Sequence, residues 1–164
     1  MMLPDDPLPE PYPDSSGSKS QGEPEVEPSN SESTETGDGL RPLDVATDLL
    51  CPRCNKTLCG GMLDQFPVAF CPECHGVLID NQGIGNVIAI RRSEYQGPEQ
   101  TPQPLDPQAL EVHGNCPNCG AKMEVYPYGG PGNVVMDGCR ACHMVWLDHG
   151  EISAIVQAPG LRHD

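Results

Sequence analysis

C-P-R-C at Cys51–Cys54 is followed, after 16 residues, by C-P-E-C-H at Cys71–His75. The chain repeats it as C-P-N-C at Cys116–Cys119 and, after 19 residues, as C-R-A-C-H at Cys139–His143. Two copies of one pattern are far harder to produce by chance than a single copy. The repeat therefore indicates two units built on the same plan.

The C-x-x-C pairs have the spacing of zinc sites. A C-x-x-C turn places two sulfur atoms on one side of a tight loop, and two facing loops supply a tetrahedral cage of four thiolates. Gaps of 16 and 19 residues lie in the ~15–20-residue range of such sites. Structural zinc contributes of order 10–16 kcal/mol, which is enough to fold a small unit. We therefore expect two Zn²⁺ ions per chain, held by Cys51, Cys54, Cys71 and Cys74 and by Cys116, Cys119, Cys139 and Cys142.

The composition agrees with units that do not fold around an apolar core alone. Aromatic residues make up 4% of the 164 residues, against 18 glycines and 19 prolines. No apolar run is long enough to span a membrane. The N-terminus lacks the basic residues and the apolar stretch of a secretory signal, so we expect a cytoplasmic protein or, in a eukaryote, a nuclear one. In that compartment the nine cysteines are expected to be reduced, so metal binding is a better interpretation of them than disulfide bonds. Cys59, which has no partner in the pattern, is expected to be a half-buried apolar filler.

These features predict a small, metal-stabilised, mostly β fold. Each unit is expected to be a zinc ribbon of short antiparallel strands with a short helix after it. The strands are expected at Leu58–Leu63, Val68–Phe70, Val77–Ile79, Lys122–Tyr126, Val134–Met136 and Val145–Leu147. The predicted organisation is a disordered acidic tail (1–48), a first ribbon (49–92), a Pro-rich linker (93–114), a second ribbon (115–158) and a short tail (159–164). Residues 43–50 are expected to dock on the first ribbon. Whether the ribbons pack together is left open.

An aspartate stands six positions after the last cysteine of each unit. Asp148 is expected to cap a helix, with Glu151 completing a capping box. For Asp80 a capping or turn role is likewise favoured over a catalytic base, although Gly83 and Gly85 disfavour the helix that would continue through Ile90.

The second unit resembles the transcription-factor-IIB-type zinc-ribbon domain, whose pattern is a C-P-x-C loop, a C-x-x-C loop and a W-L-D-x-G-E stretch. It matches at Cys116, Cys119, Cys139, Cys142, Trp146, Leu147, Asp148, Gly150 and Glu151. The first unit matches at Cys51, Cys54, Cys71, Cys74, Gly76 and Asp80, and departs with Leu78 in place of tryptophan and with Gln82-Gly83 near the Gly-Glu. The resemblance implies a zinc-binding module and does not imply a reaction.

The same residues also fit other kinds of site. Cys71–His75 and Cys139–His143 fit the haem attachment motif C-x-x-C-H, but haem would leave the other two cysteine pairs unexplained. His75 and His143 are expected to lie at the surface or beside the ligands, because four thiolates already complete each site. A redox role for the C-x-x-C pairs is a further alternative.

The charge favours a protein partner over nucleic acid. The formal net charge is −15, and the zinc–thiolate sites make it more negative. Arg91 and Arg92 form the one basic pair, which is too little for phosphate binding. We therefore expect a non-enzymatic zinc-binding protein that contacts another protein, without a small-molecule substrate or a membrane. The alternatives are a nucleic-acid-binding accessory of transcription and a zinc-linked redox sensor.

Overall fold

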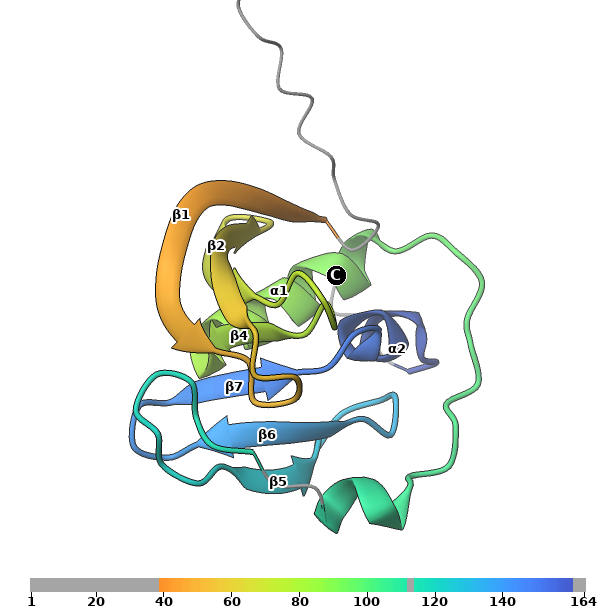
Figure 1. Ribbon diagram of the computed structural model, residues 1–164. Helices are drawn as coiled ribbons and strands as arrows, with labels where there is room; N and C mark the ends of the chain where they lie inside the picture. Colours follow the sequence, from red (N-terminus) through yellow and green to blue (C-terminus); the bar gives the residue numbers. More distant parts are fainter. Residues whose placement is uncertain (1–38, 112–113, 161–164) are drawn as a thin grey trace, which may run out of the picture. The chain divides into compact units, whose positions relative to one another are not determined.

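The computed structural model describes residues 39–111 and 114–160, which form one antiparallel sheet and two α-helices (Figure 1). The seven strands follow one another in space in the order β1-β2-β3-β4-β7-β6-β5. Their bounds are β1 Leu40–Leu50, β2 Thr57–Leu63, β3 Phe66–Phe70, β4 Val77–Asp80, β5 Glu124–Pro127, β6 Val135–Cys139 and β7 Met144–Leu147. The predicted fold class, mostly β with a helix after each cysteine-rich unit, is confirmed.

Each cysteine-rich unit contributes three consecutive strands. The first ribbon is β2-β3-β4 and the second is β5-β6-β7, and within each the neighbours pair antiparallel. The central strands are nearly continuous apolar runs that are buried on both faces, since Val77 and Ile79 of β4 lie in one apolar cluster and Leu78 lies in another. Short continuous apolar runs of this kind are typical of fully buried strands.

The two ribbons join through β4 and β7, which pair antiparallel. Val77 lies opposite Leu147, Leu78 opposite Trp146 and Ile79 opposite Val145. Leu78 and Trp146 hold the same position in the two repeats, four residues after the last cysteine. Equivalent residues therefore meet around a local two-fold axis that passes between Leu78 and Trp146. This answers the question that the sequence left open, because the ribbons share one continuous sheet.

Strand β1 runs along the outer edge of the first ribbon. It pairs with β2, although two irregularities interrupt the register between Pro42 and Leu50. The docking expected of residues 43–50 is thus found, and it extends back to Leu40, inside the segment predicted as tail. Of that predicted tail, residues 1–38 lie outside the described residues, as do residues 161–164 of the C-terminal one.

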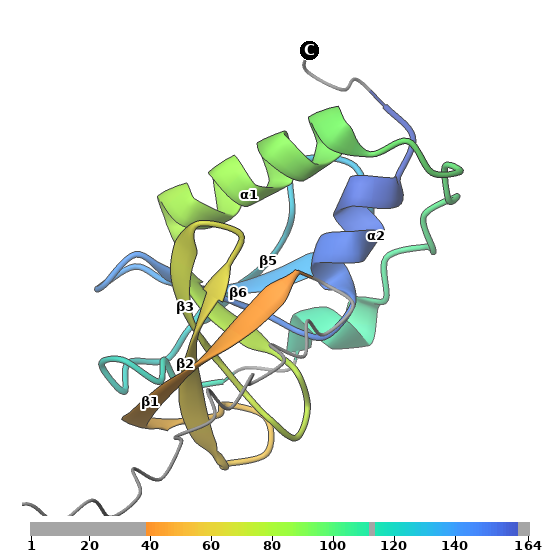
Figure 2. The same ribbon diagram turned by 90° about the horizontal axis from the view of Figure 1, so that it is seen from above.

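Helices α1 (Asn81–Glu94) and α2 (Glu151–Gln157) lie side by side on one face of the sheet (Figures 1 and 2). Buried side chains from both helices and both ribbons form one apolar cluster between these two layers; they include Ile79, Val87, Val145, Leu147 and Ile155. Neither helix is long and apolar enough to cross a membrane, and no other α-helix occurs in the described part of the chain.

The start of α1 follows the prediction for Asp80. Its carboxylate accepts hydrogen bonds from the main-chain N–H groups of Gln82 and Gly83, at 3.0 and 2.8 Å. The helix then continues through both glycines to Glu94. At the other end, Arg92 is buried and donates to the main-chain oxygens of Ile155 and Ala158 at the end of α2.

The start of α2 differs from the prediction for Asp148. The N-cap is Gly150, in the left-handed conformation, with no side-chain cap. Half of the expected capping box is present, since the main-chain N–H of Asp148 donates to Glu151 Oε2 at 2.7 Å. Asp148 does not cap the helix because its carboxylate is held elsewhere, by groups described below.

Residues of the predicted linker lie against the second ribbon. The main-chain N–H of Gln100 donates to the oxygen of Gln157 at 2.9 Å, and the Asn133 side chain donates to the oxygen of Gln103 at 2.9 Å. A 3₁₀ turn, η1, follows at Pro107–Glu111.

Candidate metal centres

The four cysteine loops share one backbone turn. The residue after each C-x-x-C adopts a positive φ: Asn55 59°, His75 60°, Gly120 74° and His143 58°. In three of the loops its N–H donates back to the oxygen of the first cysteine, at 2.8–3.0 Å. Asparagine, histidine and glycine tolerate this left-handed conformation better than most residues. The turn leaves both sulfur atoms of each loop on the same side.

The loops meet in two pairs, so that the eight predicted cysteines come together as two groups of four. In each group the sulfur atoms all lie within 4.8 Å of one another. The Sγ–Sγ distances are 3.5 Å for Cys51–Cys74 and 3.4 Å for Cys54–Cys71, and 3.4 Å for both Cys116–Cys142 and Cys119–Cys139. The chain's nine cysteines are all described, and none forms a disulfide.

This geometry fits zinc. A tetrahedron with Zn–S bonds of ~2.3 Å has sulfur–sulfur edges near ~3.8 Å, whereas a disulfide would bring two sulfurs to ~2.0 Å. The eight cysteines would hold one Zn²⁺ in each group, so the chain binds two zinc ions. Zinc here supplies cross-links in place of a larger core.

The pKa values of the cysteines differ within each group of four sulfur atoms. Burial raises the pKa of the Cys74 thiol to about 12, and the neighbouring Cys51 and Cys71 sulfurs add to the rise. Burial would also raise the pKa of Cys71, but main-chain N–H groups of Cys74 and Glu73 outweigh it and lower the pKa to about 7. Four thiolates cannot all ionise so close together unless a metal neutralises them. Cys116 repeats the rise to about 12 in the second group.

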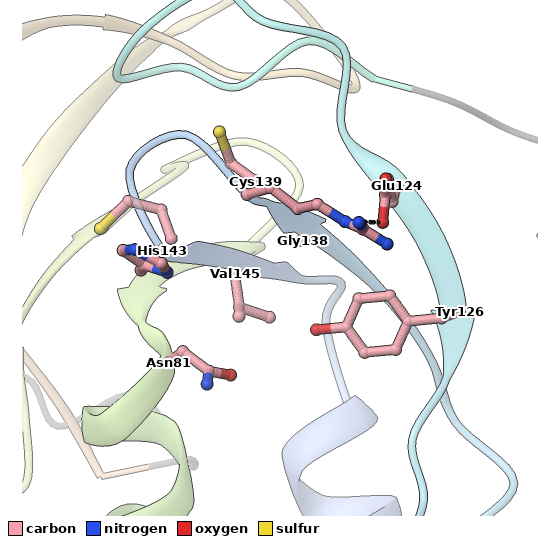
Figure 3. A pocket seen from close by; sticks show the side chains of 9 residues that line it. Asn81, Glu124, Tyr126, Gly138, Cys139, His143 and Val145 are labelled. Carbon is pink, nitrogen blue, oxygen red and sulfur yellow. Dashed lines mark hydrogen bonds and ion pairs between the residues drawn. The ribbon is translucent and has the colours of Figure 1, made fainter.

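The two histidines of the C-x-x-C-H motifs are exposed and belong to neither group of metal-binding side chains in the described residues. The His75 ring stacks at a tilt on His149, with ring centroids 5.5 Å apart. His143 lies with Asn81 and Tyr126 along an open hollow of about 370 Å³ between the second ribbon and the start of α1 (Figure 3). Neither histidine is needed as a metal ligand, and both stand at turn positions with a positive φ, which histidine tolerates. Cys59 is partly buried against the apolar cluster, where a filler was expected.

One apolar cluster serves both metal centres. Two cysteines from each group, Cys51, Cys71, Cys116 and Cys139, are buried in it with Leu58, Leu78, Met123 and Trp146. Trp146 is fully buried at its centre. Its indole occupies the space beside Gly76, where a Cβ would come within 2.2 Å of the ring. The two centres consequently share packing as well as a sheet.

Arg53 links the first metal centre to the second ribbon. It stands between Cys51 and Cys54, and its Nε donates to both carboxylate oxygens of Asp148 at 3.1 Å. Its Nη2 donates to the same carboxylate at 2.9 Å and also forms an ion pair with Asp137. Trp146 Nε1 donates to Asp148 as well, at 2.8 Å. These contacts explain why Asp148 is not free to cap α2.

Burial and the charges of this network together shift the pKa values of Arg53 and Glu151. Burial would lower the pKa of Arg53, but the hydrogen bond and charge of Asp148, with the charge of Asp137, outweigh it and raise the pKa. Burial also raises the pKa of Glu151 to about 8, and the negative charges of Asp148 and Asp137 act in the same direction. Arg53 thus stays protonated, and Glu151 is largely protonated at neutral pH.

Sequence reasoning missed Arg53 and Asp137. A signal for each was present. Arg53 occupies a loop position that holds Asn118 in the other ribbon, and Asp137 is a charge inside the otherwise apolar run Val134–Cys139. A charge in a buried strand needs a partner, but nothing in the sequence names a partner 84 residues away.

Comparison with known families identifies the second ribbon. Residues 115–158 match the family model described as "Transcription factor zinc-finger", the TFIIB-type zinc ribbon. That segment is therefore similar to the TFIIB-type zinc ribbon, as the resemblance implied. The four cysteines at 51–74 are compatible with a tandem copy. Comparisons with curated proteins and with solved structures give no match.

Proposed function

We propose that this chain is a non-enzymatic interaction module, in which two structural zinc ions hold a surface that contacts a basic region of another protein. The observation that carries the proposal is the closed tetrathiolate geometry of both centres. A catalytic zinc keeps a coordination position open for water or substrate. Four cysteines leave none, so zinc in this chain supports shape.

The charge distribution points to a basic partner. Residues 39–160 contain thirteen acidic and seven basic residues. Three of the seven, Arg53, Arg91 and Arg140, are in ion pairs with carboxylates, and Arg92 is buried. The basic pair Arg91-Arg92 is therefore occupied within the fold. Few cations are left for the phosphate contacts that nucleic-acid binding requires.

The test uses the two-zinc protein as bait for proteins in a cell extract treated with nuclease. We expect a basic protein to be retained, to be released by moderate salt, and to be lost when the bait is stripped of zinc. A low-salt gel-shift assay with duplex DNA and with RNA should show no complex. Retention only in the absence of nuclease, or a gel shift, would contradict the proposal and favour a nucleic-acid role.

A further inference from the structure

We infer that the partner docks on a surface formed by β1 and the hollow between the two ribbons' first cysteine loops, and that it does so with an extended segment bearing a lysine or arginine. This inference rests on the proposed function, because it names the surface and the chemistry of the partner.

The apolar part of this surface consists of exposed side chains of β1. Three large apolar side chains of the described residues are exposed, namely Leu43 (41%), Val45 (54%) and Leu50 (48%), and all three lie in β1. Strand β1 is also at the edge of the sheet. Exposed apolar side chains on an edge strand favour a surface that another chain covers.

The end of β1 leads into a hollow of about 400 Å³ between the ribbons. Asp48 and Leu50 line it from β1, Pro52 and Asn55 from the first ribbon, and Asn115 and Pro117 from the second. A long basic side chain suits this lining, since Leu50 and the prolines can cover its methylene groups while Asp48 and the amide oxygens receive its charged end.

The charge around the hollow favours a cation. Cys51 and Cys116 line it, one from each metal centre, and a zinc ion with four thiolates carries a net charge of about −2. Arg53 also lines it, but Asp148 and Asp137 compensate its charge. In addition, the 38 residues before Gly39 contain ten acidic residues and one basic residue. An acidic segment would repel an acidic partner and attract a basic one.

The binding test uses a fluorescein-labelled peptide of alternating lysine and valine, with a glutamate–valine peptide as the opposite-charge probe. Fluorescence anisotropy with the two-zinc protein should show binding of the lysine peptide only. Asp48→Asn and Leu50→Ser should each weaken it by about fivefold, the equivalent of roughly 1 kcal/mol. Glu73→Gln is the matched control, because it removes one charge from an exposed residue that does not line the hollow. It should change the affinity by less than about twofold.

Amide NMR of the two-zinc protein provides a second readout, with peptide-induced shifts expected at residues 48–50 and 115. Trp146 fluorescence and zinc content show that each variant is folded. Equal binding by Asp48→Asn, Leu50→Ser and the native protein, or shifts confined to other residues, would overturn the inference. So would a dimer in analytical ultracentrifugation that Leu43→Ser and Val45→Ser together abolish, because β1 would then contact a second copy.

The outcome can be separated from that of the proposed function. If the basic protein from nuclease-treated extract is retained equally by native bait and by Asp48→Asn/Leu50→Ser bait, the proposed function stands and the surface is wrong. If no protein is retained by native bait, the proposed function itself fails.

Discussion

Gly76 of the first ribbon leaves room for the indole of Trp146 from the second ribbon. Because a Cβ at this position would lie 2.2 Å from Cζ2 of Trp146, Gly76→Ala must push the indole out of its place. Overpacking of this kind costs about 1–3 kcal/mol. We expect a loss in that range in denaturant unfolding of the two-zinc protein, followed by the fluorescence of Trp146, the chain's one tryptophan.

The control for this substitution is Gly85→Ala. A Cβ at Gly85, within α1, meets nothing within 4 Å, so the change should raise stability by about 1 kcal/mol through helix propensity. If both alanine variants shift the midpoint in the same direction, steric conflict with Trp146 is not the cause.

Glu151 gives the folded protein a pH dependence. In the unfolded chain it loses its proton near its ordinary pKa of 4.5, whereas in the fold it holds the proton to a pKa of about 8. The folded state binds more protons between these values, so the stability from this residue is full below pH 4.5 and is lost as pH rises to about 8. One such group changes the free energy of unfolding by at most about 1.4 kcal/mol per pH unit.

Glu151→Gln removes this titration and keeps an oxygen for the main-chain N–H of Asp148. Between pH 6 and pH 8, the native protein should therefore lose stability relative to the glutamine variant, measured by urea unfolding with zinc in excess. Parallel pH profiles for the two proteins would mean that Glu151 is already ionised in the fold.

At the scale of the element, Asp80 is the start signal of α1. Asp80→Ala removes the acceptor for the N–H groups of Gln82 and Gly83, and the loss of such a cap costs roughly 0.5–2 kcal/mol. Thermal unfolding measured by circular dichroism should show this loss. Asn86→Ala, an exposed substitution in the same helix, should instead leave stability equal or slightly higher; a similar loss in both would argue against capping.

The strands and cysteine loops were the parts of this fold that the sequence predicted best. Strands follow short apolar runs next to the cysteine loops, and the place of each loop follows from the C-x-x-C spacing. The helix caps show where local signals fail. Asp80 acts as its position suggests, while Asp148 in the equivalent position is drawn to Arg53, 95 residues earlier. A distant partner of opposite charge outweighs the local capping preference, and no local pattern reports it.

For the molecule as a whole, the same limit applies to the junction between the ribbons. Val77–Asp80 and Met144–Leu147 each have the composition of a buried strand, but nothing in either run specifies the other as its neighbour. The eight cysteines could be placed in two groups from spacing alone, because each group is closed within one repeat. Packing between the repeats depends on Gly76, Trp146 and Arg53, whose roles appear only in three dimensions.

The shared cluster and the Arg53 contacts predict that the two zinc ions are lost together. Removal of the first ion should disorder a cysteine loop that packs against the other centre. A chelator titration followed by native mass spectrometry should therefore show two-zinc and zinc-free protein, with little of the one-zinc species. Trp146 fluorescence should change in step. Persistence of a one-zinc form as the main species would show that the centres are independent.

Two variants test whether Arg53 carries this coupling. Arg53→Lys keeps the charge but loses the forked contact with Asp148, and it should increase the one-zinc population. Arg140→Lys is matched to it, since Arg140 also stands in a cysteine loop but pairs with Glu124 of its own ribbon. It should leave the distribution of zinc states unchanged, and an equal effect of both variants would remove the special role of Arg53.

The local two-fold axis has a consequence for the two halves of the chain. Trp146 lies against Gly76, yet the counterpart of Gly76 in the second half is Met144, and the counterpart of Trp146 in the first half is Leu78. A chain made of two second halves would set an indole against a methionine on both sides of the axis, and a chain made of two first halves would leave the same space empty. We therefore expect that neither half can substitute for the other, because the two repeats differ at the positions where they meet.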